Sequence, residues 1–224
     1  MKHLIIGQGE IGSALHSILK CDIRDIENTV QQTKYDCIHI CYPYSNNFCR
    51  SVKKYRRQYN PKYVVVHSTV PVGTCRKLDA IHSPVIGVHP HLAESILTFK
   101  KVISSRPMAK ELEKFGIKTV YVKKSEDSEA GKLYSLLIYG INVLLEKEIF
   151  DYCKVGKLDY DSVYNLFVSI YNEGYKKMGM EKYTMYKLQH REGPIGGHCV
   201  VQNGPRLGTA FAKILATLNR KYKK

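Results

Sequence analysis

The stretch over residues 2–15 constrains the fold of this chain more than any other. An apolar run at 4–6 leads directly into Gly7-x-Gly9-x-x-Gly12, after which apolar residues recur at helical spacing. This pattern predicts a strand, a tight turn and a helix. Glycine suits such a turn because it allows unusual backbone angles, close approach of a phosphate and close packing of the helix on the strand. The free N–H groups at the start of the helix also favour a phosphate-bearing ligand.

The strand, turn and helix together predict a site for a dinucleotide. The pyrophosphate would lie against the backbone of Gly7, Gly9, Glu10, Ile11 and Gly12. A short second strand is expected over residues 21–25, and an acid that closes this strand binds the adenosine ribose. We predict Asp25 in that role and keep Asp22 as the alternative. Either acid favours NAD over NADP, although Arg24 could meet a 2′-phosphate, so the cofactor that we expect is NAD.

Composition narrows the range of partners. The chain has 224 residues and a formal net charge of +15, which favours anionic partners. Its basic residues are spread along the sequence, so a nucleic-acid partner is not expected. No apolar run approaches the ~18 residues of a membrane span. The seven cysteines form no C-x-x-C pair and no zinc-like cluster. We therefore expect a cytoplasmic protein with no membrane partner, no metal and no disulfide.

Strands alternate with helices over the first 124 residues. Strands are expected at 35–41, 63–67, 84–88 and 118–122, and helices at 48–59 and 108–115. This alternation predicts a Rossmann-type, doubly wound parallel sheet of the α/β class. Ligands of such sheets bind beyond the carboxyl ends of the strands, so the cofactor site would include Tyr42, Pro43, Ser68 and Thr69.

The pattern changes at Ser125, after which the sequence is typical of helices. A long helix is expected over 125–152, further helices over 160–177 and 207–220, and a glycine-rich loop over 192–200. We therefore predict two domains, an NAD-binding domain over 1–124 and a smaller all-helical domain over 125–224. The long helix is more apolar than a surface helix needs to be, which predicts a homodimer.

Four motifs follow one another along the chain. They are the glycine turn, Ser-Thr-Val-Pro-x-Gly-Thr at 68–74, Lys132 in Glu-Ala-Gly-Lys-Leu-Tyr-Ser, and Gly-Gly-His-Cys at 196–199. Together they resemble the nucleotide-sugar dehydrogenases that oxidise a sugar C6 alcohol to a uronic acid, the family of UDP-glucose, GDP-mannose and UDP-N-acetylmannosamine dehydrogenases. The resemblance spans nearly the whole chain. It covers two domains of that family and leaves its third domain, which grips the nucleoside diphosphate, without a counterpart.

The resemblance implies an NAD-dependent enzyme that oxidises the CH–OH group of a nucleotide-sugar. In that family the loop cysteine, here Cys199, adds to the aldehyde formed first, and the thiohemiacetal is oxidised to a thioester that water hydrolyses. The residues themselves agree, because flanking glycines expose the thiol and His198 could lower its pKa. Lys132 matches the lysine that stabilises the oxyanion, and Thr69 matches a threonine that positions water and cofactor.

Three positions depart from the family's pattern. One is His91, because many members have glutamate after the proline that is Pro90 here. The family usually has asparagine four residues after the lysine and aspartate four residues after the cysteine, whereas this chain has Leu136 and Asn203. Because an amide cannot act as a general base, the activation of water for thioester hydrolysis is weakened.

Two other functions fit the same residues. A reductase of the 6-phosphogluconate or 3-hydroxyacid dehydrogenase type also joins a Rossmann domain to a helical one and uses a lysine on the first long helix, but it needs no cysteine loop. A non-catalytic NAD-binding module would retain the cofactor after Leu136 and Asn203 replaced working groups.

Overall fold

The fold is described from a computed structural model, which covers residues 1–25, 34–196 and 200–222. These residues form two compact units, Met1–Leu133 and Tyr134–Lys224. No helix in these ranges is both long and apolar enough to cross a membrane. The six cysteines that lie within them are free thiols.

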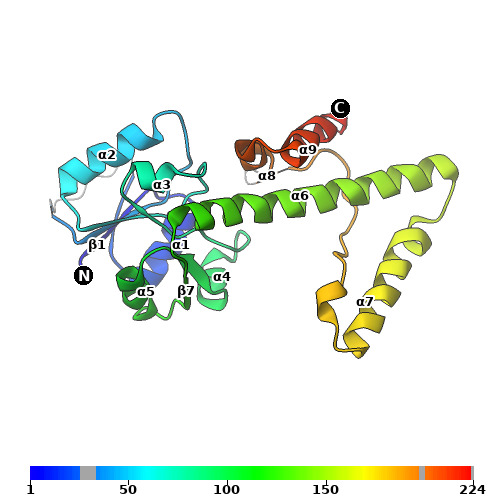
Figure 1. The fold of residues 1–224 in the computed structure, drawn as a ribbon, viewed down its shortest axis with the longest axis horizontal. Coiled ribbons are helices and arrows are strands. Elements are labelled where there is room, and N and C mark those ends of the chain that lie inside the picture. The colour runs from blue at the N-terminus through cyan, green and yellow to red at the C-terminus, as the bar shows by residue number, and fades with distance from the viewer. Residues whose placement is uncertain (26–33, 197–199, 223–224) are drawn as a thin grey trace. The chain divides into compact units, whose positions relative to one another are not determined.

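The first unit is built on a sheet of five parallel strands (Figure 1). The strands are β1 (His3–Ile6), β2 (Asp22–Arg24), β3 (Cys37–Ile40), β4 (Tyr63–Val66) and β5 (Ile81–His82), in the spatial order β2-β1-β3-β4-β5. This sheet and its helices confirm the predicted α/β fold class. β1 pairs with both β2 and β3, so the order of the strands reverses between β1 and β3. Doubly wound sheets bind their ligands at such a reversal.

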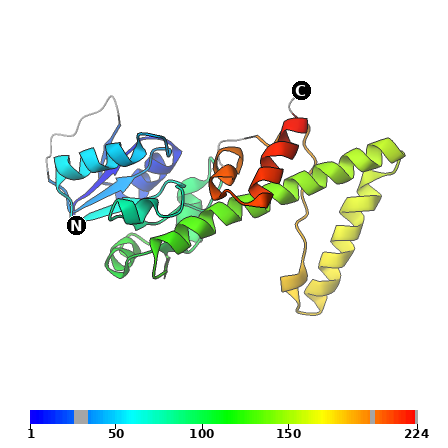
Figure 2. The same ribbon diagram turned by 45° about the horizontal axis from the view of Figure 1, so that its top comes forward.

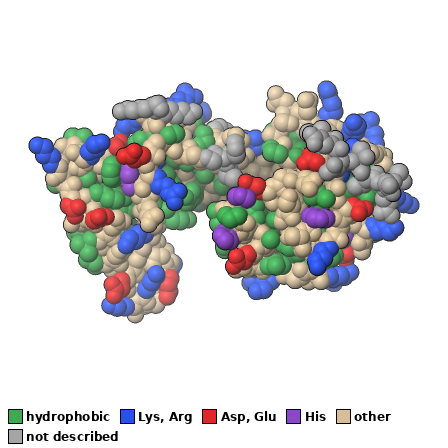
Figure 3. Space-filling model, turned by 180° about the vertical axis from the view of Figure 1, so that it is seen from behind, with side chains coloured by type: hydrophobic (Ala, Val, Ile, Leu, Met, Phe, Trp, Pro, Cys, Tyr) green, Lys and Arg blue, Asp and Glu red, His purple; other side chains and the backbone are tan. Residues whose placement is uncertain are grey.

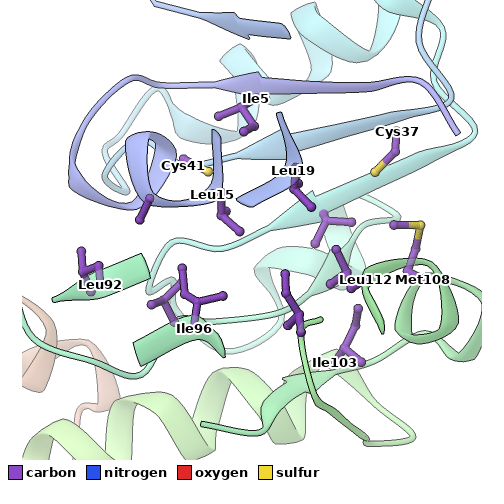
Figure 4. Close-up of a cluster of buried hydrophobic side chains, with 14 of the residues drawn as sticks. Ile5, Leu15, Leu19, Cys37, Cys41, Leu92, Ile96, Ile103, Met108 and Leu112 are labelled. Carbon is purple, nitrogen blue, oxygen red and sulfur yellow. The ribbon is translucent and has the colours of Figure 1, made fainter. Parts of the chain in front are cut away.

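Helices cover both faces of this sheet because its central strands are buried on both sides. On one face, Ile5 and its neighbours pack against α1 (Glu10–Leu19), α4 (Leu92–Thr98) and α5 (Arg106–Glu113) (Figure 4). On the other face, Leu4 and its neighbours pack against α2 (Phe48–Tyr59) and α3 (Thr74–Lys77) (Figure 2). Two hydrophobic cores therefore hold the sheet, one on each face.

The strand predicted over residues 84–88 is wrong. The strand that pairs with β4 is β5, and the chain after Ser83 leaves the sheet. The backbone carbonyls at this point accept hydrogen bonds from side chains instead of from a neighbouring strand. His67 and Lys101 both donate to the carbonyl of Ser83, and Lys101 also donates to the carbonyl of Pro84. Pro84 also has no N–H to donate to a ladder.

The strand predicted over residues 118–122 exists but does not close the main sheet. It is β7 (Thr119–Tyr121), and it pairs in parallel with β6 (Lys101–Ile103) in a separate sheet of two strands. β6 is not among the predicted strands, because it has only three residues and the first of them, Lys101, is charged, so no apolar pattern marks it. A bond from the N–H of Ser104 to the carbonyl of His82 links this pair to β5.

The long helix predicted from residue 125 is α6 (Ser125–Gly156), whose first turns belong to the first unit. The second unit continues with a π-helical turn (Asp161–Leu166), α7 (Phe167–Lys177), a 3₁₀ turn (Glu181–Tyr183), α8 (Val200–Asn203), a 3₁₀ turn (Gly204–Leu207) and α9 (Ala210–Lys221). Its small core joins Leu137 and Leu144 of α6 to Leu215 of α9. α9 can approach α6 closely at Gly140, where a Cβ would lie 3.0 Å from Leu215.

Candidate functional site

The three glycines of the turn after β1 have three different structural roles. Gly7 has a φ of +103°, and a Cβ there would lie 2.9 Å from the backbone N of Tyr42. A Cβ on Gly12 would lie 1.8 Å from the carbonyl oxygen of Gly7, so α1 packs directly on the turn. A Cβ on Gly9 would meet nothing within 4 Å. The fold therefore requires Gly7 and Gly12, whereas Gly9 keeps a space open beside the backbone.

The start of α1 faces this open space without a side-chain cap. Gly9 is the N-cap residue in extended conformation and has no side chain that could cap the first N–H groups of the helix. Glu10 is exposed, while Ile11 packs against the core and fixes the helix on the sheet. Uncapped N–H groups and the positive end of the helix dipole are the features that bind a pyrophosphate. The backbone at Gly9 to Gly12 thus fits a dinucleotide.

Asp25 lies at the edge of the same turn. Its Oδ2 accepts a hydrogen bond of 2.9 Å from the backbone N–H of Gln8. The alternative acid, Asp22, accepts a bond of 2.7 Å from the hydroxyl of Tyr35 and is thereby held elsewhere. Asp25 therefore has the geometry expected for a ribose ligand, because it follows β2 and is tied to the glycine turn.

Arg24 belongs to an aromatic cluster that was not predicted from the sequence. Its Nη1 donates to the hydroxyl of Tyr59, and its guanidinium lies 5.3 Å from the ring centroid of Tyr55. Stacking of this kind stabilises a guanidinium through the negative face of the ring. The tyrosines stand four residues apart on α2, a spacing that could have indicated a shared face. Arg24 is thus held at the end of β2 by α2.

The two predicted residues after β3 differ in exposure. The ring of Tyr42 packs 5.2 Å from that of Phe48, and the backbone carbonyl of Tyr42 accepts a 2.6 Å bond from the hydroxyl of Ser68. Pro43 is exposed. Ser68 thereby joins the ends of β3 and β4 at the carboxyl edge of the sheet, close to the backbone of Gly7.

The loop at 68–74 is anchored by Glu129, which was not among the residues predicted from the sequence. The two oxygens of this buried carboxylate accept bonds from the N–H groups of Gly73 at 2.5 Å and Cys75 at 2.7 Å. Gly73, with a φ of +87°, allows the turn that presents these groups. Thr69 is half-buried in the same loop. Glu129 thus holds the loop on the first turns of α6.

Lys132, less than one helical turn after Glu129, lies near other basic groups of the first unit. It is half-buried, and its charge acts on Lys101 and His82. Burial, together with this charge, lowers the pKa of Lys101 to about 7. Burial also lowers the pKa of His82 to about 4, with smaller contributions from Lys101 and Lys132. The positive charge of Lys132, which acts on both groups, is of the kind that stabilises negative charge on a substrate oxygen.

The remaining predicted residues belong to the second unit. Cys199 lies outside the described residues, together with Gly197 and His198. Asn203 is the last residue of α8. Leu136 is half-buried and packs against the core of that unit, as expected for an apolar side chain on α6.

Neither a protein-family model nor a curated protein sequence matches this chain. Solved structures do match it. UDP-D-ManNAc dehydrogenase from Pyrococcus horikoshii has a TM-score of 0.75 at 14% identity, over 99% of this chain and 69% of its own. 3-Hydroxyisobutyrate dehydrogenase from Mycobacterium tuberculosis, solved with L-serine, has a TM-score of 0.71 at 10% identity. The match covers 99% of this chain and 93% of that protein. Psf3 in complex with NADP+ and 2-OPP has a TM-score of 0.54 at 14% identity, and the match covers 98% of this chain and 93% of that protein.

At such identities the likeness concerns the fold. The chain has the architecture of these proteins, a Rossmann-like α/β unit followed by a helical unit. Two of them are dehydrogenases, one acting on a nucleotide-sugar and one on a 3-hydroxy acid, and the third was solved with NADP+.

Proposed function

We propose that this protein is an NAD-dependent dehydrogenase of the nucleotide-sugar type, which oxidises a CH–OH group of an anionic substrate. The observation that carries the proposal is the open space at Gly9, with Asp25 bonded to the backbone of the same turn at 2.9 Å. A bound nicotinamide would supply the hydride acceptor. The net charge of +15 favours a substrate that carries a diphosphate.

The choice of a nucleotide-sugar rests on the motifs at 68–74, Lys132 and Cys199. Lys132 would stabilise the alkoxide from which hydride leaves, and Thr69 would position water and cofactor. The Cys199 thiolate would add to the aldehyde carbon, and loss of a second hydride would leave a thioester. Attack by water would release the carboxylate and regenerate the thiol. Asn203, an amide, would not accept the proton of that water as a carboxylate does.

The test is the time course of NADH formation with UDP- and GDP-sugars. Loss of a general base costs a factor of about 10² to 10⁴ in rate, so a burst of NADH should precede a slow phase. Because only the first oxidation can proceed without the thiol, the burst should fall to at most one NADH per site in Cys199→Ala and stay at its full size in the control Cys49→Ala. The slow phase should quicken in Asn203→Asp. Intact-mass spectrometry would detect the thioester. Absence of any adduct, with the wild type behaving like Cys199→Ala, would exclude this chemistry.

The second candidate is a reductase of the 3-hydroxyacid dehydrogenase type. The likeness to 3-hydroxyisobutyrate dehydrogenase, which extends over 93% of that protein, favours it. This chemistry would use Lys132 and would not need Cys199. Turnover of 3-hydroxy acids that survives Cys199→Ala but fails in Lys132→Ala would support it over the first proposal.

A further inference from the structure

Two histidines and a cysteine meet inside the first unit, on the face of the sheet that α5 covers. His3 is the register partner of Cys37 on the neighbouring strand. His39 lies two residues after Cys37 on β3, so its side chain points to the same face of the sheet. Cys37 is one of the labelled side chains in Figure 4. All three are buried. The ligating atoms lie within 4.8 Å of one another. Nδ1 of His3 is 2.9 Å from Nε2 of His39, which is 3.5 Å from Sγ of Cys37.

The hydrogen atom on His39 is fixed from one side by a chain of bonds. Nδ1 of His67 lies 2.7 Å from the carbonyl oxygen of Ser83, and an oxygen of this kind only accepts, so this nitrogen carries a hydrogen. Nε2 of a neutral His67 is then an acceptor, and it lies 2.9 Å from Nδ1 of His39. His39 therefore carries its hydrogen on Nδ1 and has a lone pair on Nε2.

The hydrogen atom on His3 is fixed from the other side by Glu111. The carboxylate of Glu111 accepts bonds from the amino group of Met1 at 3.0 Å and from Nζ of Lys114 at 2.6 Å. Its Oε1 also lies 3.3 Å from Nε2 of His3, which is therefore the donor. A neutral His3 is left with its lone pair on Nδ1, the atom that faces His39.

Two lone pairs thus face each other across 2.9 Å in a buried site. They repel unless a cation lies between them. The Cys37 thiol can donate to Nε2 of His39, but this leaves Nδ1 of His3 without a donor. A single shared proton or a metal ion would satisfy both nitrogens.

We propose that His3, Cys37 and His39 form a buried zinc site. Zn²⁺ bonds to imidazole nitrogen at about 2.0 Å and to thiolate sulfur at about 2.3 Å, and a tetrahedral angle between them spans about 3.5 Å. The nitrogen and sulfur of His39 and Cys37 are separated by 3.5 Å. Nδ1 of His3 and Nε2 of His39, which are 2.9 Å apart, need to separate by only about a few tenths of an ångström to bind the same ion. Binding releases the thiol proton of Cys37, and the fourth position accepts water or another small ligand.

The groups around the three residues also suit a metal. Zinc-bound histidines characteristically donate their other N–H to a carboxylate or another acceptor, which fixes ring orientation. Glu111 takes this role for His3, and His67 takes it for His39. A search of the sequence for closely spaced ligands misses the site, because its ligands come from two strands that only the sheet brings together.

The test is metal content after expression in zinc-supplemented medium and removal of free metal. Wild type should retain about one zinc per chain, as a single site requires. Cys37→Ser and His3→Gln should lose most of it. The matched control is Cys41→Ser, because Cys41 is buried directly after the same strand and lies outside the cluster. Refolding with Co²⁺ should give a thiolate-to-cobalt absorption band in wild type and Cys41→Ser that is missing in Cys37→Ser.

Folding of each variant is checked by circular dichroism, and the cobalt spectrum of wild type needs no variant. A wild-type protein that binds neither zinc nor cobalt when folded in their presence would overturn the proposal and assign the position to a shared proton. Equal zinc in wild type and in folded Cys37→Ser would also overturn it.

Discussion

At the scale of single residues, the glycine turn separates what the fold needs from what a ligand needs. Gly12 has no room for a side chain, since its Cβ would overlap the carbonyl of Gly7, whereas Gly9 borders open space. The motif predicts a separate role for each of these glycines, and the structure shows the unusual backbone angle at Gly7 and the close packing at Gly12.

We predict opposite outcomes for two substitutions in this turn. Gly9→Val should fold normally, because its φ of −72° suits any residue, but should weaken NAD binding at least about tenfold, or about 1.4 kcal/mol. Gly12→Val should lower the free energy of unfolding by about 1 to 3 kcal/mol or more, because the side chain overlaps the turn. Calorimetry with NAD and urea denaturation would measure both effects. Unchanged NAD affinity in Gly9→Val would rule out this site.

Lys101 illustrates the cost of a buried charge. Burial lowers its pKa to about 7, while the unfolded chain retains a value of about 10.5, so between these pH values the unfolded state binds more protons. Stability should therefore rise with pH from about 7 upward, by at most about 1.4 kcal/mol per pH unit from this residue. Lys101→Met, which cannot titrate, should reduce that rise. Urea denaturation curves of both proteins, measured from neutral to mildly alkaline pH, would test it; parallel pH dependences would contradict the prediction.

At the scale of elements, the sequence predicts those strands and helices whose pattern is long enough to be distinctive. β3 and β4 are buried almost throughout, and their apolar residues mark them clearly. β5 and β6 span only Ile81–His82 and Lys101–Ile103, too short for any periodicity, and the apolar residues at 84–88 suggested a strand that side-chain bonds to Ser83 prevent.

Glu129 provides a test of how elements hold the candidate site. Glu129→Gln keeps the shape but replaces one acceptor oxygen by an NH₂ group that faces a backbone N–H, so we expect a loss of about 1 to 3 kcal/mol in stability. Glu126→Gln is the control, because Glu126 pairs with a largely exposed Arg76 and should change stability by less than about 1 kcal/mol. Urea denaturation would measure both. Equal effects of the two substitutions would show that the carboxylate does not anchor the loop.

At the scale of the whole molecule, the candidate site is only partly predictable from sequence. The glycine turn and Asp25 are local features that a motif identifies. Glu129, the stacking of Arg24 on α2 and the meeting of His3 with His39 depend on contacts between distant segments, which no spacing rule reveals. The predicted nucleophile, Cys199, lies outside the described residues, so its role stays a prediction.

The second unit carries exposed apolar side chains that its own small core does not cover. Val155 on α6 is 86% exposed, and Phe167 and Ile170 on α7 are 70% and 60% exposed. Hydrophobic side chains lie among charged ones on the face shown in Figure 3. An apolar groove of about 340 Å³ also lies within this unit, lined by Leu137, Ile141 and Phe211 among others. Exposed apolar surface of this kind marks protein interfaces.

We therefore propose that the protein is a homodimer formed through its helical unit, and expect a mass of twice 25.6 kDa by light scattering at micromolar concentration. Phe167→Glu combined with Ile170→Glu should shift the protein toward the monomer, because burying two carboxylates in an apolar interface is costly. Lys176→Glu on the same helix is the control for added acid and should leave the dimer intact. NAD binding by the monomeric variant would show that the first unit remains folded. A wild type that is strictly monomeric at micromolar concentration would refute the proposal.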